Sequence, residues 1–292
     1  MDEKTIAVIG AGSMGRGIAQ SFIQNGFSVI LIDKEEEVLK NATEYISSGI
    51  DKLVELEKIS KNQKEEFKKN LSVKSKIEGL NKPFLIIEAI DENFMIKKKL
   101  FKRLDNLINE DVILATNTST LSVTKIAAST KNPQRVIGLH FFIPAEIMRL
   151  VEVIPGEKTS LEIINKSINI LNNIKKIPIK CKDSPGFIVN RLILLFQNEA
   201  ARLLDEKIAS VEDIDNAIRL GLNHKMGPLE LADFVGLDIL YNSLMILQQE
   251  LGAERYKPAN TLKGLIEKGY LGRKTGKGFY EYKQKSENVD KK

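Results

Sequence analysis

Short, almost continuous apolar runs recur through the first half of the chain, separated by charged segments with helical periodicity. The runs are rich in Ile, Leu and Val, which is typical of strands buried on both faces of a parallel sheet. Strands that alternate with helices predict an α/β fold with a doubly wound sheet. The predicted strands cover residues 5–9, 28–32, 84–88, 112–115, 136–141, 151–154 and 177–181.

The pattern changes twice. Residues 35–70 are Lys- and Glu-rich and too long for a simple crossover, so they predict a helical hairpin that projects from the sheet. Beyond Lys182-Asp183-Ser184-Pro185-Gly186 the periodicity is helical. We therefore expect a first domain over 1–184 and an all-α second domain over 185–292. The main predicted helices are 187–205, 211–220 and 228–251, with Ser210 and Asn260 as candidate N-caps.

Composition narrows the classes of function. Of 292 residues, 42% are hydrophobic and 28% charged, as in ordinary globular proteins. The net charge of +5 is spread along the chain without a basic block that contains aromatic residues, so we expect no nucleic-acid binding. The surplus favours an anionic substrate such as a phosphorylated carrier. A single cysteine, Cys181, and two histidines give no expectation of a disulfide or a metal site.

The N-terminus leads from Met-Asp-Glu-Lys directly into the first predicted strand, which leaves no room for a signal peptide. No apolar stretch approaches the roughly 20 residues that a membrane span needs. We expect a cytoplasmic protein that does not bind membranes.

A glycine-rich motif directly follows the first predicted strand and opens a helical segment. It consists of Gly10, Ala11, Gly12, Ser13, Met14 and Gly15. The first glycine allows a tight turn, the second lets the backbone approach a pyrophosphate, and the third lets helix and strand pack closely. Asp33 ends the second predicted strand, where a carboxylate accepts hydrogen bonds from ribose hydroxyls and repels a 2′-phosphate. The context predicts a Rossmann-type site for NAD rather than NADP. A glycine turn without a ligand is the alternative.

His140 stands at the end of one apolar run, and Glu152 lies inside the next. A carboxylate in such a run needs a partner, because an unpaired buried charge is costly. An imidazole is a suitable partner and is the usual proton acceptor near neutral pH. The pair is therefore a candidate general base, although a lone histidine on an apolar face is more often structural.

Two further polar positions have both structural and functional interpretations. Thr116-Asn117-Thr118-Ser119-Thr120 follows the strand 112–115, where ligands of doubly wound sheets bind. The same residues could instead cap a helix that begins near Leu121. Asn190 lies in an apolar helix, where its amide is either satisfied internally or faces a cleft.

Seven motifs in fixed order make the chain resemble the L-3-hydroxyacyl-CoA dehydrogenases, and its length and domain order resemble the short bacterial 3-hydroxybutyryl-CoA dehydrogenases. The resemblance runs from about Lys4 to Tyr282. The motifs are Gly10-Ala-Gly-Ser-Met-Gly15, Asn117-Thr-Ser119, Gly138-Leu-His-Phe-Phe142, Leu150-Val-Glu-Val153, Pro185-Gly-Phe-Ile-Val-Asn-Arg191, Asn223-His224 with Met226-Gly-Pro228, and Gly272-Arg-Lys-Thr-Gly-Lys-Gly-Phe-Tyr280.

The resemblance implies an NAD-dependent enzyme that oxidises short L-3-hydroxyacyl-CoA substrates, with 3-hydroxybutyryl-CoA foremost, and assembles as a homodimer through its helical domain. His140 would be the general base and Glu152 would orient it. Ser119 and Asn190 would bind the substrate oxygens. Residues that match NAD-contacting positions of the family are Asp33, Glu92, Lys97, Ser119 and Lys274. We also expect the segment from Gly276 to Tyr280 to dock onto the first domain.

The chain departs from the family at three places, one of which is Lys225, where the family usually has Pro after His224. Ile143 stands where the histidine motif usually continues with Asn, near the nicotinamide. In the hairpin, Glu55-Leu56-Glu57 stand where the family has a basic residue for CoA, although Lys52 and Lys58 lie close by. A dehydrogenase of a free 3-hydroxy acid, such as carnitine or a sugar acid, and a cofactor-binding homologue with little turnover therefore remain as alternatives.

Overall fold

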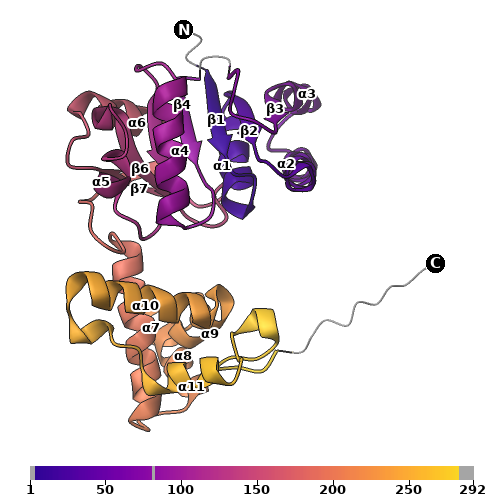
Figure 1. Ribbon diagram of the computed structural model, residues 1–292. Coiled ribbons are helices and arrows are strands. Elements are labelled where there is room, and N and C mark those ends of the chain that lie inside the picture. The colour runs from indigo at the N-terminus through magenta and orange to yellow at the C-terminus, as the bar shows by residue number, and fades with distance from the viewer. Residues whose placement is uncertain (1–3, 81–82, 283–292) are drawn as a thin grey trace. The chain divides into compact units, whose positions relative to one another are not determined.

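The computed structural model describes residues 4–80 and 83–282, and the chain divides into two compact units, Met1–Phe187 and Ile188–Lys292. Strands and helices alternate along the first unit (Figure 1). Its elements are β1 (Thr5–Ile9), α1 (Ser13–Ile23), β2 (Ser28–Ile32), α2 (Glu36–Glu55), α3 (Lys61–Lys69), β3 (Leu71–Lys74), β4 (Leu85–Glu88), α4 (Phe94–Leu107), β5 (Ile113–Thr116), α5 (Val123–Ala127), a 3₁₀ turn (Pro133–Arg135), β6 (Val136–Phe141), β7 (Leu150–Pro155), α6 (Leu161–Asn173) and β8 (Ile177–Lys180).

The strands form one eight-stranded sheet in the order β3-β2-β1-β4-β5-β6-β7-β8. Its neighbours from β3 to β6 pair in parallel. The predicted doubly wound α/β fold is confirmed, and so are all seven predicted strands to within a few residues. Because these strands are parallel, the chain segments that follow β1, β2, β4, β5 and β6 all emerge at one edge of the sheet, where ligands of such folds bind.

The sheet differs from the prediction at both ends. Strand β3 was not predicted, because this edge strand is Leu-Ser-Val-Lys with its Ser and Val exposed, so it lacks a continuous apolar run. Strand β7 runs antiparallel to β6, and β8 is parallel to β7. The physical reason is the short connection 142–149, since a parallel crossover needs a dozen or more residues.

Apolar side chains from both faces of the sheet are buried against helices. Along β1, Ile6 and Val8 belong to one cluster with residues of α1, α2 and α6, whereas Ala7 and Ile9 belong to a second with residues of α4 and α5. This two-sided burial explains why the strands consist almost entirely of apolar residues. The segment for which we predict a hairpin holds two helices, α2 and α3, which lie at the β3 edge of the unit (Figure 1).

The second unit is helical, as predicted. Its core combines residues of α7, α8, α9, α10 and α11. The predicted helix 228–251 is wrong as a single element, because Gly236 adopts φ +113° and separates two helices. The elements are α7 (Val189–Asp205), α8 (Val211–Leu222), α9 (Pro228–Val235), α10 (Leu237–Leu251), a 3₁₀ turn (Glu254–Tyr256), α11 (Asn260–Glu267) and a second 3₁₀ turn (Arg273–Thr275).

The two predicted caps of this unit have opposite outcomes. Ser210 caps α8, and its hydroxyl accepts a hydrogen bond from the Asp213 amide. Asn260 is wrong as a cap, because Ala259 is the N-cap residue of α11. The carboxylate of Asp205, at the end of α7, accepts from the amides of Asn260 and Thr261 instead. The cap therefore comes from a helix that is distant in sequence.

Two buried aspartates hold the segment after α11. Asp233, 1% exposed, accepts hydrogen bonds from the amides of Phe279 and Tyr280 and from the Tyr282 hydroxyl. Asp215, 0% exposed, accepts from the Tyr280 hydroxyl. These hydrogen bonds join the segment to α8 and α9 of its own unit. Its docking onto the first domain stays a prediction. Within residues 4–80 and 83–282, no helix is long and apolar enough to cross a membrane.

Candidate active site

The glycine loop after β1 has the local geometry of a dinucleotide site. Gly10 has φ +99°, and a Cβ there would approach the Ala89 carbonyl oxygen to 2.5 Å. A Cβ on Gly15 would lie 1.7 Å from the Gly10 oxygen, so helix and turn can meet only at glycine. A Cβ on Gly12, in contrast, would meet no atom within 4 Å. The open space at Gly12, the N-cap of α1, fits the approach of a pyrophosphate to the helix N-terminus.

Asp33 directly follows β2, and its carboxylate lies beside the glycine loop. One oxygen accepts a hydrogen bond from the Ala11 amide at 2.8 Å, and the other accepts from the Glu35 amide at 3.1 Å. The carboxylate is thus fixed in orientation by two backbone donors, next to the backbone that would carry the phosphates. Gly10, Gly12, Gly15 and Asp33 together fit NAD, as the sequence predicts.

His140 and Glu152 are directly opposite each other on the antiparallel strands β6 and β7. Side chains of such a pair project from the same face of the sheet. His140 Nδ1 lies 2.7 Å from Glu152 Oε2, and the side chains are only 7% and 1% exposed. The rings of Phe142 and Phe187 pack on the imidazole, with centroids 4.5 and 5.7 Å away. The imidazole therefore has Nδ1 bound to a buried carboxylate, the pairing that the sequence predicts for a general base.

The loop after β5 is tied to the end of β6. Asn117 Oδ1 accepts from the Phe141 amide at 2.9 Å, next to His140 in sequence. The backbone N–H of Asn117 donates a hydrogen bond to the backbone carbonyl of Glu88 at the end of β4. The three strand ends are thus linked through one asparagine, which fixes the start of the loop that carries Ser119.

One carboxylate oxygen of Glu92 accepts hydrogen bonds from several residues of the loop after β5. Oε1 accepts hydrogen bonds from the Ser119 and Thr120 amides and from the hydroxyls of Thr118, Ser119 and Thr120. Burial raises the pKa of Glu92, but the charge of Lys97 and the hydrogen bonds from the loop outweigh this effect and lower it. Glu92 is therefore an ionised anchor for residues 118–120.

Lys97 lies behind Glu92 and is almost fully buried. Its side chain is 1% exposed, and Nζ lies 2.5 Å from Glu88 Oε1 and 3.3 Å from Glu92 Oε2. Burial raises the pKa of Glu88, an effect that Lys97, Thr116 and the Ile90 amide oppose. The structure thus brings Glu92, Lys97 and Ser119 into one network, in which the lysine side chain is almost fully buried.

The helix-cap interpretation of the Thr116–Thr120 cluster is only partly right. The N-cap of α5 is Ser122, outside the cluster, and the Asp183 carboxylate accepts from the Val123 and Thr124 amides. Thr118 Oγ1 does accept from the Leu121 amide just before the helix. Most donors of the cluster serve the Glu92 network instead.

Two predicted site residues belong to the second unit. Asn190 lies in the first turn of α7 and is half-buried. Lys274 lies in the last 3₁₀ turn, and its Nζ contacts both carboxylate oxygens of Asp238 at 2.5 and 2.6 Å. Within that unit Lys274 is thus one half of an ion pair at the start of α10.

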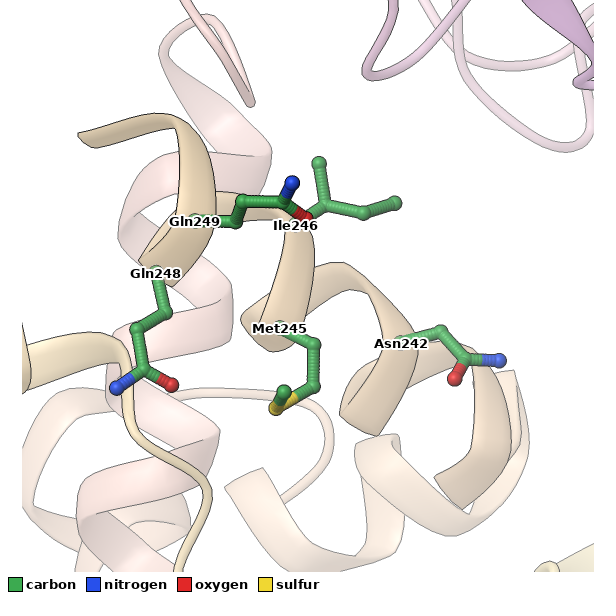
Figure 2. A pocket seen from close by; sticks show the side chains of 5 residues that line it. All are labelled: Asn242, Met245, Ile246, Gln248 and Gln249. Atoms are coloured by element: carbon green, nitrogen blue, oxygen red, sulfur yellow. The ribbon is translucent and has the colours of Figure 1, made fainter. Parts of the chain in front are cut away.

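A surface hollow of the second unit offers no comparable chemistry. Its five lining residues all come from α10 and none is ionisable: Asn242, Met245, Ile246, Gln248 and Gln249 (Figure 2). We therefore exclude this hollow as the reaction centre.

The sequence prediction missed Glu88 as a member of the site. Glu88 ends the apolar run of β4 and is 0% exposed. The argument that singled out Glu152, a carboxylate within an apolar run, applies equally to Glu88 and could have found it. Its lysine partner, nine residues along the chain in α4, could not be recognised from spacing alone.

Comparisons with known proteins agree with this geometry. Residues 5–184 match the family model described as "3-hydroxyacyl-CoA dehydrogenase, NAD binding domain", and residues 186–282 match the C-terminal domain of the same family. A 3-hydroxybutyryl-CoA dehydrogenase of Clostridioides difficile is 43% identical over 95% of this chain and 99% of its own length. The human mitochondrial hydroxyacyl-coenzyme A dehydrogenase is 40% identical over 96% of this chain and 91% of its own.

Among solved structures, the (S)-3-hydroxybutyryl-CoA dehydrogenase of Ralstonia eutropha superposes with a TM-score of 0.94 at 38% identity, and the match covers 97% of this chain and 100% of that one. The resemblance drawn from the motifs is confirmed, together with the expectation of an NAD-dependent oxidoreductase. The chain belongs to the 3-hydroxyacyl-CoA dehydrogenase family.

Proposed function

We propose that this protein interconverts short-chain L-3-hydroxyacyl-CoA and 3-oxoacyl-CoA, with 3-hydroxybutyryl-CoA as the main substrate. The observation that carries the proposal is the buried His140–Glu152 pair at the edge of the sheet that also bears the glycine loop and Asp33. The names of the bacterial relatives from C. difficile and R. eutropha support the butyryl chain length.

His140 acts as the general base. With Nδ1 bound to Glu152, Nε2 takes the proton of the substrate's C3 hydroxyl. The imidazole becomes cationic in this step, and the Glu152 carboxylate stabilises the charge and keeps the ring in the required tautomer. Bound NAD supplies the hydride acceptor. In the reverse direction the imidazolium returns the proton to the oxygen of the 3-oxo group.

Ser119 and Asn190 hold the substrate oxygens. Ser119 lies in the loop that Glu92 orders, so its hydroxyl starts from a restricted position. Restricting the orientation of C3 and its hydroxyl can contribute several kcal/mol to the rate. Gly10, Ala11, Gly12, Ser13, Met14 and Gly15 would hold the pyrophosphate, Asp33 the adenosine ribose, and Glu92 and Lys274 would contact the cofactor as well.

A substrate comparison tests the proposal. We expect the protein to oxidise NADH with acetoacetyl-CoA, and to be at least tenfold less efficient with free acetoacetate at equal concentration. Activity restricted to free 3-oxo acids would contradict the acyl-CoA assignment and support a free-acid dehydrogenase. NADH binding without turnover on either compound would contradict the enzymatic proposal altogether.

We also propose that the helical unit joins two copies of the chain. Several large apolar side chains of this unit are exposed, which favours burial against a partner. They include Leu192, Leu220, Leu222, Phe234, Ile239 and Met245. Sedimentation should give twice the chain mass. Leu220→Glu and Met245→Glu should shift the protein to monomers, whereas Met95→Glu on the first unit should not. A monomeric wild type at micromolar concentration would contradict this proposal.

A further inference from the structure

Phe187 has a backbone conformation that suits glycine better than an aromatic residue. Its φ is +47°, yet its side chain is only 5% exposed and it stands just before a helix, α7. The other non-glycine residues with positive φ in the described parts of the chain are exposed and follow the ends of helices, where a left-handed residue is common. They are Glu57, Lys175, Lys207 and Asn223. The buried aromatic residue at this strained position therefore needs its own explanation.

The ring of Phe187 contacts the imidazole of the base. Its centroid lies 5.7 Å from that of His140, with 54° between the ring planes, a separation at which aromatic rings orient each other. The hydrogen bond to Glu152 fixes the position of Nδ1, but the imidazole could still tilt about that bond. The contacts on the ring therefore decide where Nε2 points. Phe142 provides the other aromatic contact.

Phe187 also completes an apolar cluster beside the base. It packs with Val123 and Ile154, which are both fully buried. Ile154 is the cross-strand partner of Gly138, two residues before His140, so it projects from the same face of the sheet as the base. A Cβ on Gly138 would lie 2.7 Å from Val123 Cγ2, so the cluster fills the space that a side chain there would need. This apolar wall excludes water and so strengthens the attraction between carboxylate and imidazole.

The segment that carries Phe187 is fixed to the first unit. The Asp183 carboxylate accepts hydrogen bonds from the first two amides of α5 at 3.1 and 2.7 Å. The Phe187 amide donates to the Ser184 carbonyl at 2.9 Å, and Gly186 has φ +75°. Two consecutive residues with positive φ thus form a turn whose start is anchored. The turn directs the aromatic ring into the cluster.

The need for a turn does not explain this residue. Glycine or asparagine would adopt the left-handed conformation at lower cost. Burial of apolar area does not explain it either, because a leucine would also bury apolar surface. The strained aromatic residue is explained if a flat ring is required against the imidazole.

We propose that Phe187 is a positioning residue for the general base, whose ring holds the imidazole of His140 with Nδ1 toward Glu152 and Nε2 toward the reacting hydroxyl. This inference rests on the proposed role of His140. Misplacement of a reacting group by about 1 Å can lower turnover by about a hundredfold. The effect should therefore appear in kcat, with little change in the affinity for NADH.

Three substitutions separate the ring from the turn. Phe187→Gly removes the ring and relieves the strained φ, Phe187→Ala removes the ring and keeps the strain, and Phe187→Leu keeps apolar volume without a flat ring. Phe22→Leu is the matched control, because Phe22 is fully buried in the same unit and its ring contacts Phe27 at 5.4 Å. The measurements are the melting temperature, the dissociation constant of NADH, and kcat and KM with acetoacetyl-CoA.

A spectroscopic measurement reports on the imidazole directly. The ¹⁵N chemical shifts of a histidine ring show which nitrogen carries the proton. His224 is the only other histidine of the chain, so protein labelled with ¹⁵N-histidine gives two sets of ring signals, and His224→Gln identifies its own set. In the wild type we expect the neutral ring of His140 to carry its proton on Nδ1.

We expect kcat to fall roughly 10- to 100-fold in both Phe187→Gly and Phe187→Ala, with NADH affinity within about threefold of the wild type. The ring signals of His140 should move toward a mixture of tautomers in both variants. Phe187→Gly should melt at a higher temperature than Phe187→Ala without regaining activity, because relief of the strain does not replace the ring. Phe187→Leu should show a smaller loss. Phe22→Leu should lower the melting temperature but leave kcat and the His140 signals unchanged.

Wild-type kcat in a folded Phe187→Gly variant would overturn the proposal, since the turn alone would then suffice. Unchanged His140 ring signals in the folded variants would overturn it as well, whatever the activity. If the glycine and alanine variants do not fold, Phe187→Leu decides, and wild-type kcat and ring signals in that variant contradict the proposal.

The failure of the proposed function would look different. If His140→Gln keeps its turnover, or if the wild type does not turn over acetoacetyl-CoA, the role assigned to His140 is wrong. The ring signals of His140 would still show whether Phe187 orients the imidazole.

Discussion

The two units bury carboxylates in different ways, and the difference lies in whether the partner can change its charge. In the first unit Glu152 faces His140, a group that can change its charge during a reaction. In the second unit Asp233 faces two backbone amides and a tyrosine hydroxyl, which keep their protons near neutral pH. Both carboxylates are at most 1% exposed. Burial of an acid therefore does not by itself predict a catalytic site, whereas a partner that can change its charge favours one.

The same contrast applies to pKa values. Burial raises the pKa of Asp233 despite its three donors, which are neutral and only partly compensate for lost water. Glu92 in the first unit has a lowered pKa, although burial acts against it, because Lys97 adds a full positive charge. A neutral set of donors suits a structural anchor, and a charged partner suits a group that must remain ionised.

The largest effect should follow from removing the base. His140→Gln preserves size and some hydrogen-bonding capacity but cannot accept the hydroxyl proton, so we expect kcat to fall by about 10³ to 10⁴. The dissociation constant of NADH, measured by fluorescence titration, should change less than threefold. If the variant keeps most of its turnover, His140 is not the general base.

Glu152→Gln tests the partner rather than the base. The amide keeps the shape of the carboxylate but cannot stabilise the imidazolium, and its NH₂ group can stabilise the wrong tautomer. We expect kcat to fall by about 10² to 10³, with a smaller change in KM. The steady-state rates should be measured on protein whose circular dichroism spectrum matches the wild type. Equal kcat in both proteins would assign Glu152 a purely structural role.

In contrast to these two substitutions, Asp233→Asn should lower stability and leave kcat almost unchanged. An asparagine keeps one acceptor oxygen but weakens the bonds to Phe279, Tyr280 and Tyr282, so the free energy of unfolding should fall by about 2 kcal/mol. Urea unfolding followed by circular dichroism measures this loss. Below the unfolding transition kcat should stay within about twofold of the wild type. A hundredfold loss of kcat in the folded variant would remove the distinction between the two carboxylates.

Alkaline pH should weaken the second unit through its two half-buried tyrosines. Burial, with the neighbouring carboxylates, raises the pKa of Tyr282 to about 12 and that of Tyr280 above its usual value of 10.0. Because the folded-state values are raised, the stabilisation is fully present below pH 10.0 and is lost as the pH rises toward about 12. Thermal melts across this range should show the decline. It should be smaller in Tyr282→Phe, and an identical decline in that variant would exclude this tyrosine as its cause.

Local patterns predicted the parallel part of the fold well. Strands β1, β2 and β4 to β6 are buried on both faces, so the sequence of each strand is an almost continuous apolar run. Strand β3 was not predicted, because it lies at the edge of the sheet with Ser72 and Val73 exposed and so has no continuous apolar run. The break at Gly236 lies within a stretch whose apolar spacing continues on both sides, so periodicity alone could not separate α9 from α10.

The site was predictable where it follows the ends of strands. The glycine loop, Asp33, Ser119 and His140 all stand at such ends, and the topology of a parallel sheet brings them to one edge. Their catalytic and binding roles remain predictions. The enclosure of Lys97 could not be foreseen, because a lysine in a charged helix gives no sign of a carboxylate partner on another element.

The sequence by itself determined the α/β fold, the glycine turn and the pairing of an imidazole with a carboxylate, because each depends on short-range patterns and on the cost of burying a charge. Only the tertiary structure decided which acids became anchors. It assigned Asp205 to cap α11, Asp233 to hold the final segment, and Glu88 to pair with Lys97. The physical reason is that hydrogen bonds form with whatever donor the fold brings within about 3 Å, however far apart in the chain the two groups lie.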